Sequence, residues 1–154
     1  MDSLLEKFLK GVYLSEKDLL KVISEARLLV ERVASEILKS DSNDEESLKE
    51  LIGNTMVSVT TQRRAAEKLF EMNSQSMGVC RFILENLPDS NTEHKVKAFK
   101  IKIGRILIEN ENVEDLKLVY RYVDPLAGEV IAQLVNIKKI LAKRELEEFF
   151  RISK

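Results

Sequence analysis

The sequence predicts an all-α fold, a single-domain bundle of about six to seven helices. Its 154 residues fit one domain, and five Gly, two Pro and no Trp leave few places for tight turns. Hydrophobic residues (44%) and charged residues (33%) recur at spacings of three and four, as in amphipathic helices. The β-prone stretch 57–61 has no second strand to pair with, so it indicates a helix of weak propensity or a kink. We expect one domain over 1–154, with an N-terminal helical hairpin over 1–40 and a bundle core over 45–154.

The N-terminal half begins with a short amphipathic helix over 3–10 that ends near Gly11. Ser15 then matches an N-cap, with Asp18 three residues later. A loop over 40–44 and a helix over 45–53 follow. Between them, the helix that runs to about Lys39 carries one narrow apolar seam, formed by Leu19, Ile23, Ala26, Val30, Val33 and Ile37.

The C-terminal part of the chain contains further amphipathic stretches. Helices are expected over 62–72, 75–87, 92–110 and 112–123. Asp124 followed by proline is a strong start signal, with the aspartate as N-cap of a last helix that runs to about 150. The seam of this last helix is formed by Val130, Leu134, Ile137 and Leu141.

Charge is distributed unevenly along a chain whose net charge is −1. Residues 1–52 have a net charge of −4, residues 53–107 of +4 and residues 108–154 of −1. A dedicated nucleic-acid-binding protein is usually basic overall, so the total counts against that role. The middle third indicates a local positive surface, or it reflects the ordinary fluctuation of a chain in which a third of the residues are charged.

The sequence indicates a cytoplasmic protein with no membrane partner. Its single cysteine, Cys80, lies in an apolar run, can form no intramolecular disulfide and is expected in the core. The apolar runs are far shorter than the roughly 20 residues of a membrane span. The acidic start at Asp2 does not match the basic beginning of a signal peptide.

No constellation typical of an enzyme or a cofactor site is present. One histidine, His94, and one cysteine exclude multi-His metal sites and paired-cysteine zinc or redox motifs. The sequence contains neither of two glycine-rich phosphate-binding motifs, GxxxxGK[ST] and GxGxxG. No pair of carboxylates stands out as an acid–base couple. We therefore expect no catalytic, metal or cofactor residues and no small-molecule substrate, and an enzyme of an unrecognised type is kept as a third hypothesis.

The segment 94–105 is the most distinctive part of the sequence, with five cations: Lys95, Lys97, Lys100, Lys102 and Arg105. On a helix all five are expected off the apolar stripe, where they either bind a polyanion through its phosphates or form a solvated charged face. Gly104 would let a neighbouring backbone approach closely. A second basic cluster over 138–144 is expected to pair largely with the glutamates that follow it.

Residues 73–134 resemble the small helical subunit of type III CRISPR effector complexes (the Csm-type small subunit). The chain would be a divergent member of that family. Three motifs carry the resemblance in order. Asn73–Ser76 precedes a helix that contains Arg81, the Lys-rich segment 95–105 closes with Gly104-Arg105, and 116–127 matches a late aromatic-rich helix.

The resemblance implies a non-catalytic subunit of an RNA-guided ribonucleoprotein that contacts the guide and target backbone without reading bases. The implied partners are RNA and other protein subunits, with copies of the chain itself among the candidates. The implied nucleic-acid-binding residues are Lys95, Lys97, Lys100, Lys102, Arg105 and, as a further candidate, Arg81.

A second class of function, a helical adaptor or scaffold with no nucleic acid, is also open. The narrow seams over 19–37 and 130–141 are typical of helix pairing within or between chains. An adaptor needs a seam that is exposed in the monomer. A seam wholly buried inside the monomer would argue against this hypothesis.

Overall fold

The structure, a computed structural model, describes residues 3–39, 44–73, 76–90, 93–138 and 151. These residues form eight α-helices and one 3-10 turn and contain no strand, which confirms the predicted all-α class. Each expected helical stretch forms a helix of its own, so the described residues contain eight helices, slightly more than the predicted six to seven. Their bounds are α1 Leu4–Leu9, α2 Glu16–Lys39, α3 Glu45–Gly53, α4 Val59–Met72, α5 Met77–Asn86, α6 His94–Glu109, α7 Val113–Tyr122, η1 Asp124–Leu126 and α8 Ala127–Lys138.

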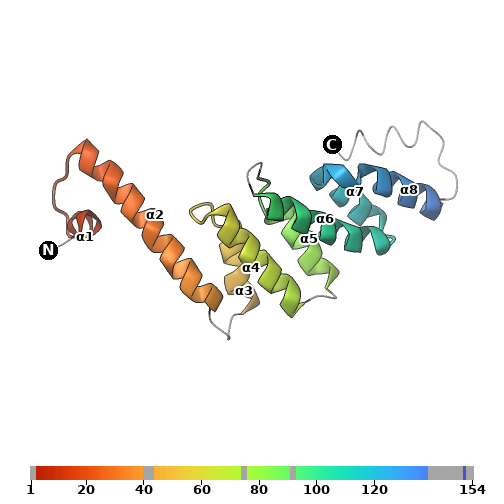
Figure 1. Ribbon diagram of the computed structural model, residues 1–154, viewed down its shortest axis with the longest axis horizontal. Coiled ribbons are helices and arrows are strands. Elements are labelled where there is room, and N and C mark those ends of the chain that lie inside the picture. Colours follow the sequence, from red (N-terminus) through yellow and green to blue (C-terminus); the bar gives the residue numbers. More distant parts are fainter. Residues whose placement is uncertain (1–2, 40–43, 74–75, 91–92, 139–150, 152–154) are drawn as a thin grey trace.

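The helices α1 and α2 form an arm that projects from the other helices (Figure 1). α1 packs on the N-terminal half of α2, and the C-terminal half of α2 meets α4. This arm lies where the sequence predicts a hairpin over 1–40. The loop expected over 40–44 falls mostly on 40–43, outside the described residues.

Helices α3 to α8 form the body and hold the hydrophobic core, to which every one of them contributes. The arm adds Ala34 and Leu38 from the end of α2. Cys80 is fully buried, as predicted. The largest fully buried side chains are Leu48, Ile52, Leu69, Ile83, Leu84, Leu87, Ile103, Leu107, Leu116, Leu126, Leu134 and Val96.

Polar caps fix where most helices begin. Ser15 Oγ accepts a hydrogen bond from the Asp18 N–H at 3.2 Å, as predicted. Asp44 and Asn112 cap α3 and α7 in the same way. The β-prone stretch turns out to be the start of α4, because Ser58 is the N-cap of that helix.

The start of the last helix differs from the prediction. Asp124 does not cap α8, because Asp124–Leu126 form a 3-10 turn and α8 begins at Ala127. Val123 occupies the N-cap position of the turn without a side-chain hydrogen bond. The predicted extension to 150, with the seam residue Leu141 and the basic side chains over 138–144, lies outside the described part of the chain.

Gly104 is buried where α6 meets α7 and η1. A Cβ atom on Gly104 would lie 2.6 Å from Leu126 Cδ1 and 3.3 Å from Val119 Cγ1. The close approach that the glycine permits is therefore made by side chains rather than by the backbone that the sequence suggests. Gly104 has a packing role in this fold.

Two carboxylates of α2 reach the N-termini of other helices. Glu31 accepts hydrogen bonds from the Ser58 N–H and, at 2.8 Å, from Thr61 Oγ1 at the start of α4. Glu25 accepts one from the Leu5 N–H at 2.8 Å in the first turn of α1. Because a helix N-terminus has unpaired N–H groups and partial positive charge, α2 is fastened to α1 on one side and to the body on the other.

We predict that Glu31→Ala loosens the joint between arm and body while the body stays folded. The change removes the acceptor at the start of α4 and should cost about 1–2 kcal/mol. Amide hydrogen exchange in the first turn of α4 should therefore become faster. Glu36→Ala, on the same helix but with a side chain that is 69% exposed, is the control and should leave exchange unchanged. Equal exchange in both variants would contradict the role of Glu31.

We also predict that Gly104→Val destabilises the body. The added side chain overlaps Leu126 and Val119, and overpacking of this kind costs about 1–3 kcal/mol. The measurement is the free energy of unfolding from urea denaturation. Gly128→Val on α8 is the control, because a Cβ there would meet nothing within 4 Å. A Gly104→Val protein as stable as its control would rule out the close approach.

Candidate functional site

The six cations that the sequence offers as nucleic-acid contacts lie on α5 and α6, in two groups. Lys95 and Lys97 are exposed in the first turns of α6 and make no ion pair with another described residue. The other four contact groups from distant parts of the sequence. They are Lys100, Lys102, Arg105 and Arg81.

Lys100 is buried, which corrects the expectation that all five cations of 94–105 lie off the apolar stripe. It is 4% exposed, and its Nζ donates to Asp89 Oδ1 at 2.8 Å. Lys100 follows Val96 by four residues and is rotated only about 40° from it on the helix. Its aliphatic stem therefore packs with the core while the ammonium reaches a carboxylate at the surface.

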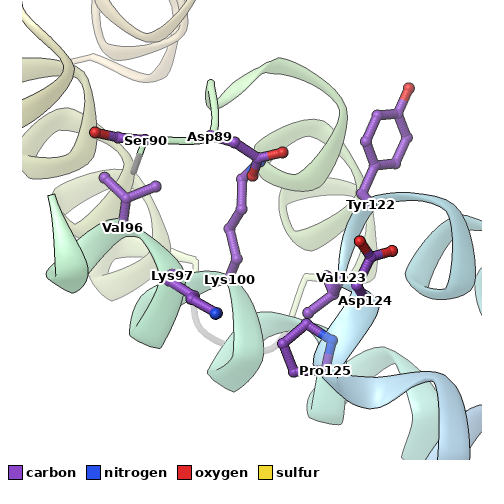
Figure 2. A pocket seen from close by; sticks show the side chains of 9 residues that line it. All are labelled: Asp89, Ser90, Val96, Lys97, Lys100, Tyr122, Val123, Asp124 and Pro125. Atoms are coloured by element: carbon purple, nitrogen blue, oxygen red, sulfur yellow. The ribbon is translucent and has the colours of Figure 1, made fainter. Parts of the chain in front are cut away.

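This ion pair forms part of the wall of a cavity of about 480 Å³ between α6 and η1. Figure 2 shows Lys100 reaching from α6 to Asp89, with Asp124 and Pro125 on the facing turn. Lys97 also lines the cavity. Two lysines are balanced by two aspartates, so the cavity does not concentrate the positive charge that a phosphate group needs.

Lys102 and Arg105 face outward but have partners as well. Lys102 Nζ lies 5.1 Å from the centre of the Phe70 ring, a cation–π contact. Arg105 Nη2 lies 3.2 Å from Glu129 Oε1 of α8, and both side chains are about half exposed. An exposed pair of this kind is worth less than about 1 kcal/mol, so Arg105 can exchange its partner at little cost.

Arg81 holds α5 against α7. Its Nε and Nη2 atoms donate to the two carboxylate oxygens of Asp115 at 2.6 and 3.0 Å. Asp115 is 2% exposed and also accepts from Asn110 Nδ2 at 2.9 Å. Burial is the largest influence on the pKa of Asp115 and raises it, but the hydrogen bonds from Arg81 and Asn110 and the Arg81 charge together lower the pKa below its ordinary value.

Acids from other elements therefore neutralise part of the basic segment and the neighbouring Arg81. Asp89, Asp115 and Glu129 lie against three of the six cations. Sequence reasoning missed these acids because they come from other elements. Only Asp115 carried a local signal, since it precedes the apolar Val119 by four residues and therefore lies about 40° from it on the helix. The implied nucleic-acid contacts stay a prediction, with Lys95 and Lys97 as the exposed cations of the set that make neither an ion pair within 4 Å nor a cation–π contact with a described residue.

Exposed apolar side chains concentrate on the arm. Tyr13 is 93% exposed and Leu20 is 67% exposed. Single exposed apolar side chains are ordinary, but many of them concentrated on one projecting element indicate an interaction surface. Ten of the fourteen exposed large hydrophobic residues that the structure describes lie on this hairpin: Phe8, Leu9, Val12, Tyr13, Leu19, Leu20, Ile23, Leu28, Leu29 and Val33.

The two predicted seams have different environments. In the seam over 19–37, Leu19, Ile23 and Val33 are exposed. In the last helix, Val130 and Leu134 are buried in the core. The first seam thus meets the condition that an adaptor requires, and the described part of the second does not.

An apolar groove of about 350 Å³ lies where the arm meets α3. Leu29, Val33 and Ile37 line it from α2, and Leu51 lines it from α3. The groove continues the exposed apolar surface of the arm toward the body.

The described ranges contain neither a candidate metal site nor a candidate membrane-spanning helix. No group of three or more His, Cys, Asp or Glu side chains there could hold a metal ion. None of the helices there is both long and apolar enough to cross a bilayer.

No protein-family model matches the chain, and no curated protein or solved structure matches it significantly. The resemblance to the CRISPR small subunit therefore stays a prediction that depends on its three sequence motifs.

We predict that Asp115→Asn destabilises the fold by about 1.5–3 kcal/mol, the usual contribution of hydrogen bonds to a charged group. The folded pKa of Asp115 is lowered. Its contribution is therefore complete above the ordinary carboxyl pKa of about 4 and is lost as the pH falls through the lowered folded value. Urea denaturation at pH 7 and at pH 3 measures both effects.

The variant should show a smaller loss of stability between these two pH values than the wild type, because its amide does not titrate. Glu114→Gln, at the adjacent residue with a side chain that is 80% exposed, is the control and should change stability by less than about 0.5 kcal/mol. An Asp115→Asn protein as stable as this control would mean that Arg81 is free for another role.

Proposed function

We propose that this chain is a helical adaptor or assembly protein that binds another protein chain through its arm. The observation that carries the proposal is the concentration of exposed large hydrophobic side chains on residues 8–33. These side chains lie on a helical hairpin that projects from the body (Figure 1). A helix presented in this way is a common element of protein–protein recognition.

The size of the surface fits a partner that covers an extended part of the arm. Burying one Leu, Ile or Phe side chain completely contributes about 1.5–3 kcal/mol. Covering most of the exposed area on the ten arm side chains would contribute on the order of 10 kcal/mol. This is comparable with the free-energy cost of bringing two proteins together, which is about 4–15 kcal/mol. A contact with one or two of these side chains would not be sufficient.

The arm also has a defined orientation, which lowers the entropy cost of binding. Glu31 fastens α2 to the start of α4, and Lys68 Nζ donates to the Leu38 carbonyl at the end of α2 at 2.6 Å. Ala34 adds apolar packing between these two polar contacts, since it is 1% exposed. A partner therefore meets a surface that is already formed.

A subunit that contacts RNA is the alternative, and the exposed Lys95 and Lys97 are its structural support. The other cations of the implied set have contacts inside the fold. Substitutions of Lys100 or Arg81 would therefore test stability as much as RNA binding, and Lys95 and Lys97 are the informative positions.

We predict that the tagged chain, purified from its native host, retains a protein partner in stoichiometric amount. The double variant Leu20→Asp/Val33→Asp should retain no more than about a tenth of the amount of partner that the wild type retains, because it places charge within the apolar surface. Both positions are exposed, so helical content and the melting temperature should stay close to those of the wild type. Mass spectrometry identifies the partner, and gel analysis of the eluate detects RNA.

The matched control is Lys95→Glu/Lys97→Glu, which reverses two exposed charges on the body and should keep the partner. Retention of the partner by the arm variant would overturn the proposal. Short RNA of defined length in the wild-type eluate, lost in the lysine variant, would establish the ribonucleoprotein hypothesis in its place.

A further inference from the structure

One face of α2 is buried at the C-terminal end of the helix and uncovered at the N-terminal end. At about 100° per residue, Leu19, Leu20 and Ile23 share an arc of about 100° with Ala34 and Leu38. The last two pack into the core. The first three are 37%, 67% and 49% exposed, because they lie beyond the body. The arm thus presents the same side of the helix that the body covers elsewhere.

This uncovered face ends in two opposite charges. Glu16 lies at its N-terminal end and Arg27 at its C-terminal end, both within the same arc and both exposed. Neither forms an ion pair or a side-chain hydrogen bond with any other residue that the structure describes. We call the set of Glu16, Leu19, Leu20, Ile23 and Arg27 the arm stripe.

The arm stripe is complementary to itself. Glu16 and Arg27 are eleven residues apart, about 16 Å along the helix, with the three apolar side chains between them. Two stripes related by a two-fold axis run antiparallel, so that each Glu16 lies level with Arg27 of the other copy. Leu20 then lies level with Ile23. A parallel pair would place Glu16 against Glu16 and Arg27 against Arg27.

The geometry points to a second copy of this chain as the occupant of the arm stripe, in an antiparallel arm-to-arm dimer. This inference rests on the proposed role of the arm as a protein-binding element. Residues 3–39 carry seven basic and six acidic side chains, so net charge does not oppose the pairing. The arm projects past the body (Figure 1), so antiparallel arms place the two bodies at opposite ends, where they do not collide.

The contact is narrow, with three apolar side chains from each copy, and small interfaces are typically transient. We therefore expect a dimer that dissociates on dilution. Sedimentation velocity of the purified full chain from about 10 μM to about 1 mM covers the dissociation constants of such complexes. The average mass should rise from that of the 17.7 kDa monomer toward twice that value.

Two exposed leucines on the same helix provide the first test. Leu20→Asp should weaken the dimer at least about ten-fold, because it places a charge at the centre of the stripe. Leu28→Asp is the matched control. Leu28 is 72% exposed, but it lies about 80° outside the stripe at its nearest edge, so its dimer should match the wild type. Circular dichroism and thermal melting check that both variants are folded.

A charge exchange provides the second test and distinguishes a second copy from any other partner. Glu16→Arg alone places cations opposite each other, and Arg27→Glu alone places acids opposite each other, so each should weaken the dimer. The double variant Glu16→Arg/Arg27→Glu restores opposite charges only if the two positions meet across a two-fold axis. Its dissociation constant should therefore return to within about three-fold of the wild-type value, because residues in contact are coupled and the effects of the two single changes do not add.

A chain that is monomeric at every concentration would overturn the inference. A dimer that Leu20→Asp leaves intact, or that the double charge exchange does not restore, would also overturn it. If the chain is monomeric but Leu20→Asp/Val33→Asp still loses a protein from native cells, the inference fails and the proposed function stands. If changes in the arm affect neither dimerisation nor the retention of a partner from native cells, both the inferred dimer and the proposed function fail.

Discussion

The arrangement of the molecule depends on the Glu31 carboxylate at the N-terminus of α4. Glu31 accepts from the Ser58 amide and the Thr61 hydroxyl, both at the start of α4. These bonds fix the rotation of α2 about its own axis. Once this rotation is fixed, Ala34 faces the core, and Leu20, four turns earlier on the same side, faces the space beyond the body. The exposure of the arm stripe therefore follows from the docking of the other end of the helix.

Several charged side chains of α6 also have partners that come from distant parts of the sequence. Along the sequence, the segment 94–105 is strongly basic because no acid lies between its cations. In the fold, Asp89 reaches Lys100 from the chain before α6, and Glu129 reaches Arg105 from α8. A local excess of one charge in a near-neutral protein is expected to meet such partners, because isolated buried charges are costly. The positive segment is therefore in large part a set of contacts that joins α6 to its neighbours.

The local features of the fold could be predicted from the sequence, and the tertiary ones could not. Ser15 and the segment over 45–53 carried their own signals, because a cap or a helical period depends only on nearby residues. The burial of Lys100 depends on which helix covers its side of α6, and that information is spread over the whole chain. The prediction that Asp124 caps the last helix was wrong for a related reason. An Asp-Pro pair fits a 3-10 turn as well as the start of an α-helix. The apolar seam of α2 was predicted, but its exposure depends on where the body ends.

An exposed apolar helix is a liability for a protein unless something limits what can bind to it. On the arm stripe, charges provide that limit. Glu16 and Arg27 lie at the two ends of the stripe, and an approaching helix of wrong direction or wrong charge would desolvate one of them without a partner, which is unfavourable. Apolar contacts between helices are tolerant of register, whereas a pair of opposite charges 16 Å or so apart accepts few alignments. The three apolar side chains of the stripe thus supply attraction, and the two charges determine which partner, in which direction, can use it.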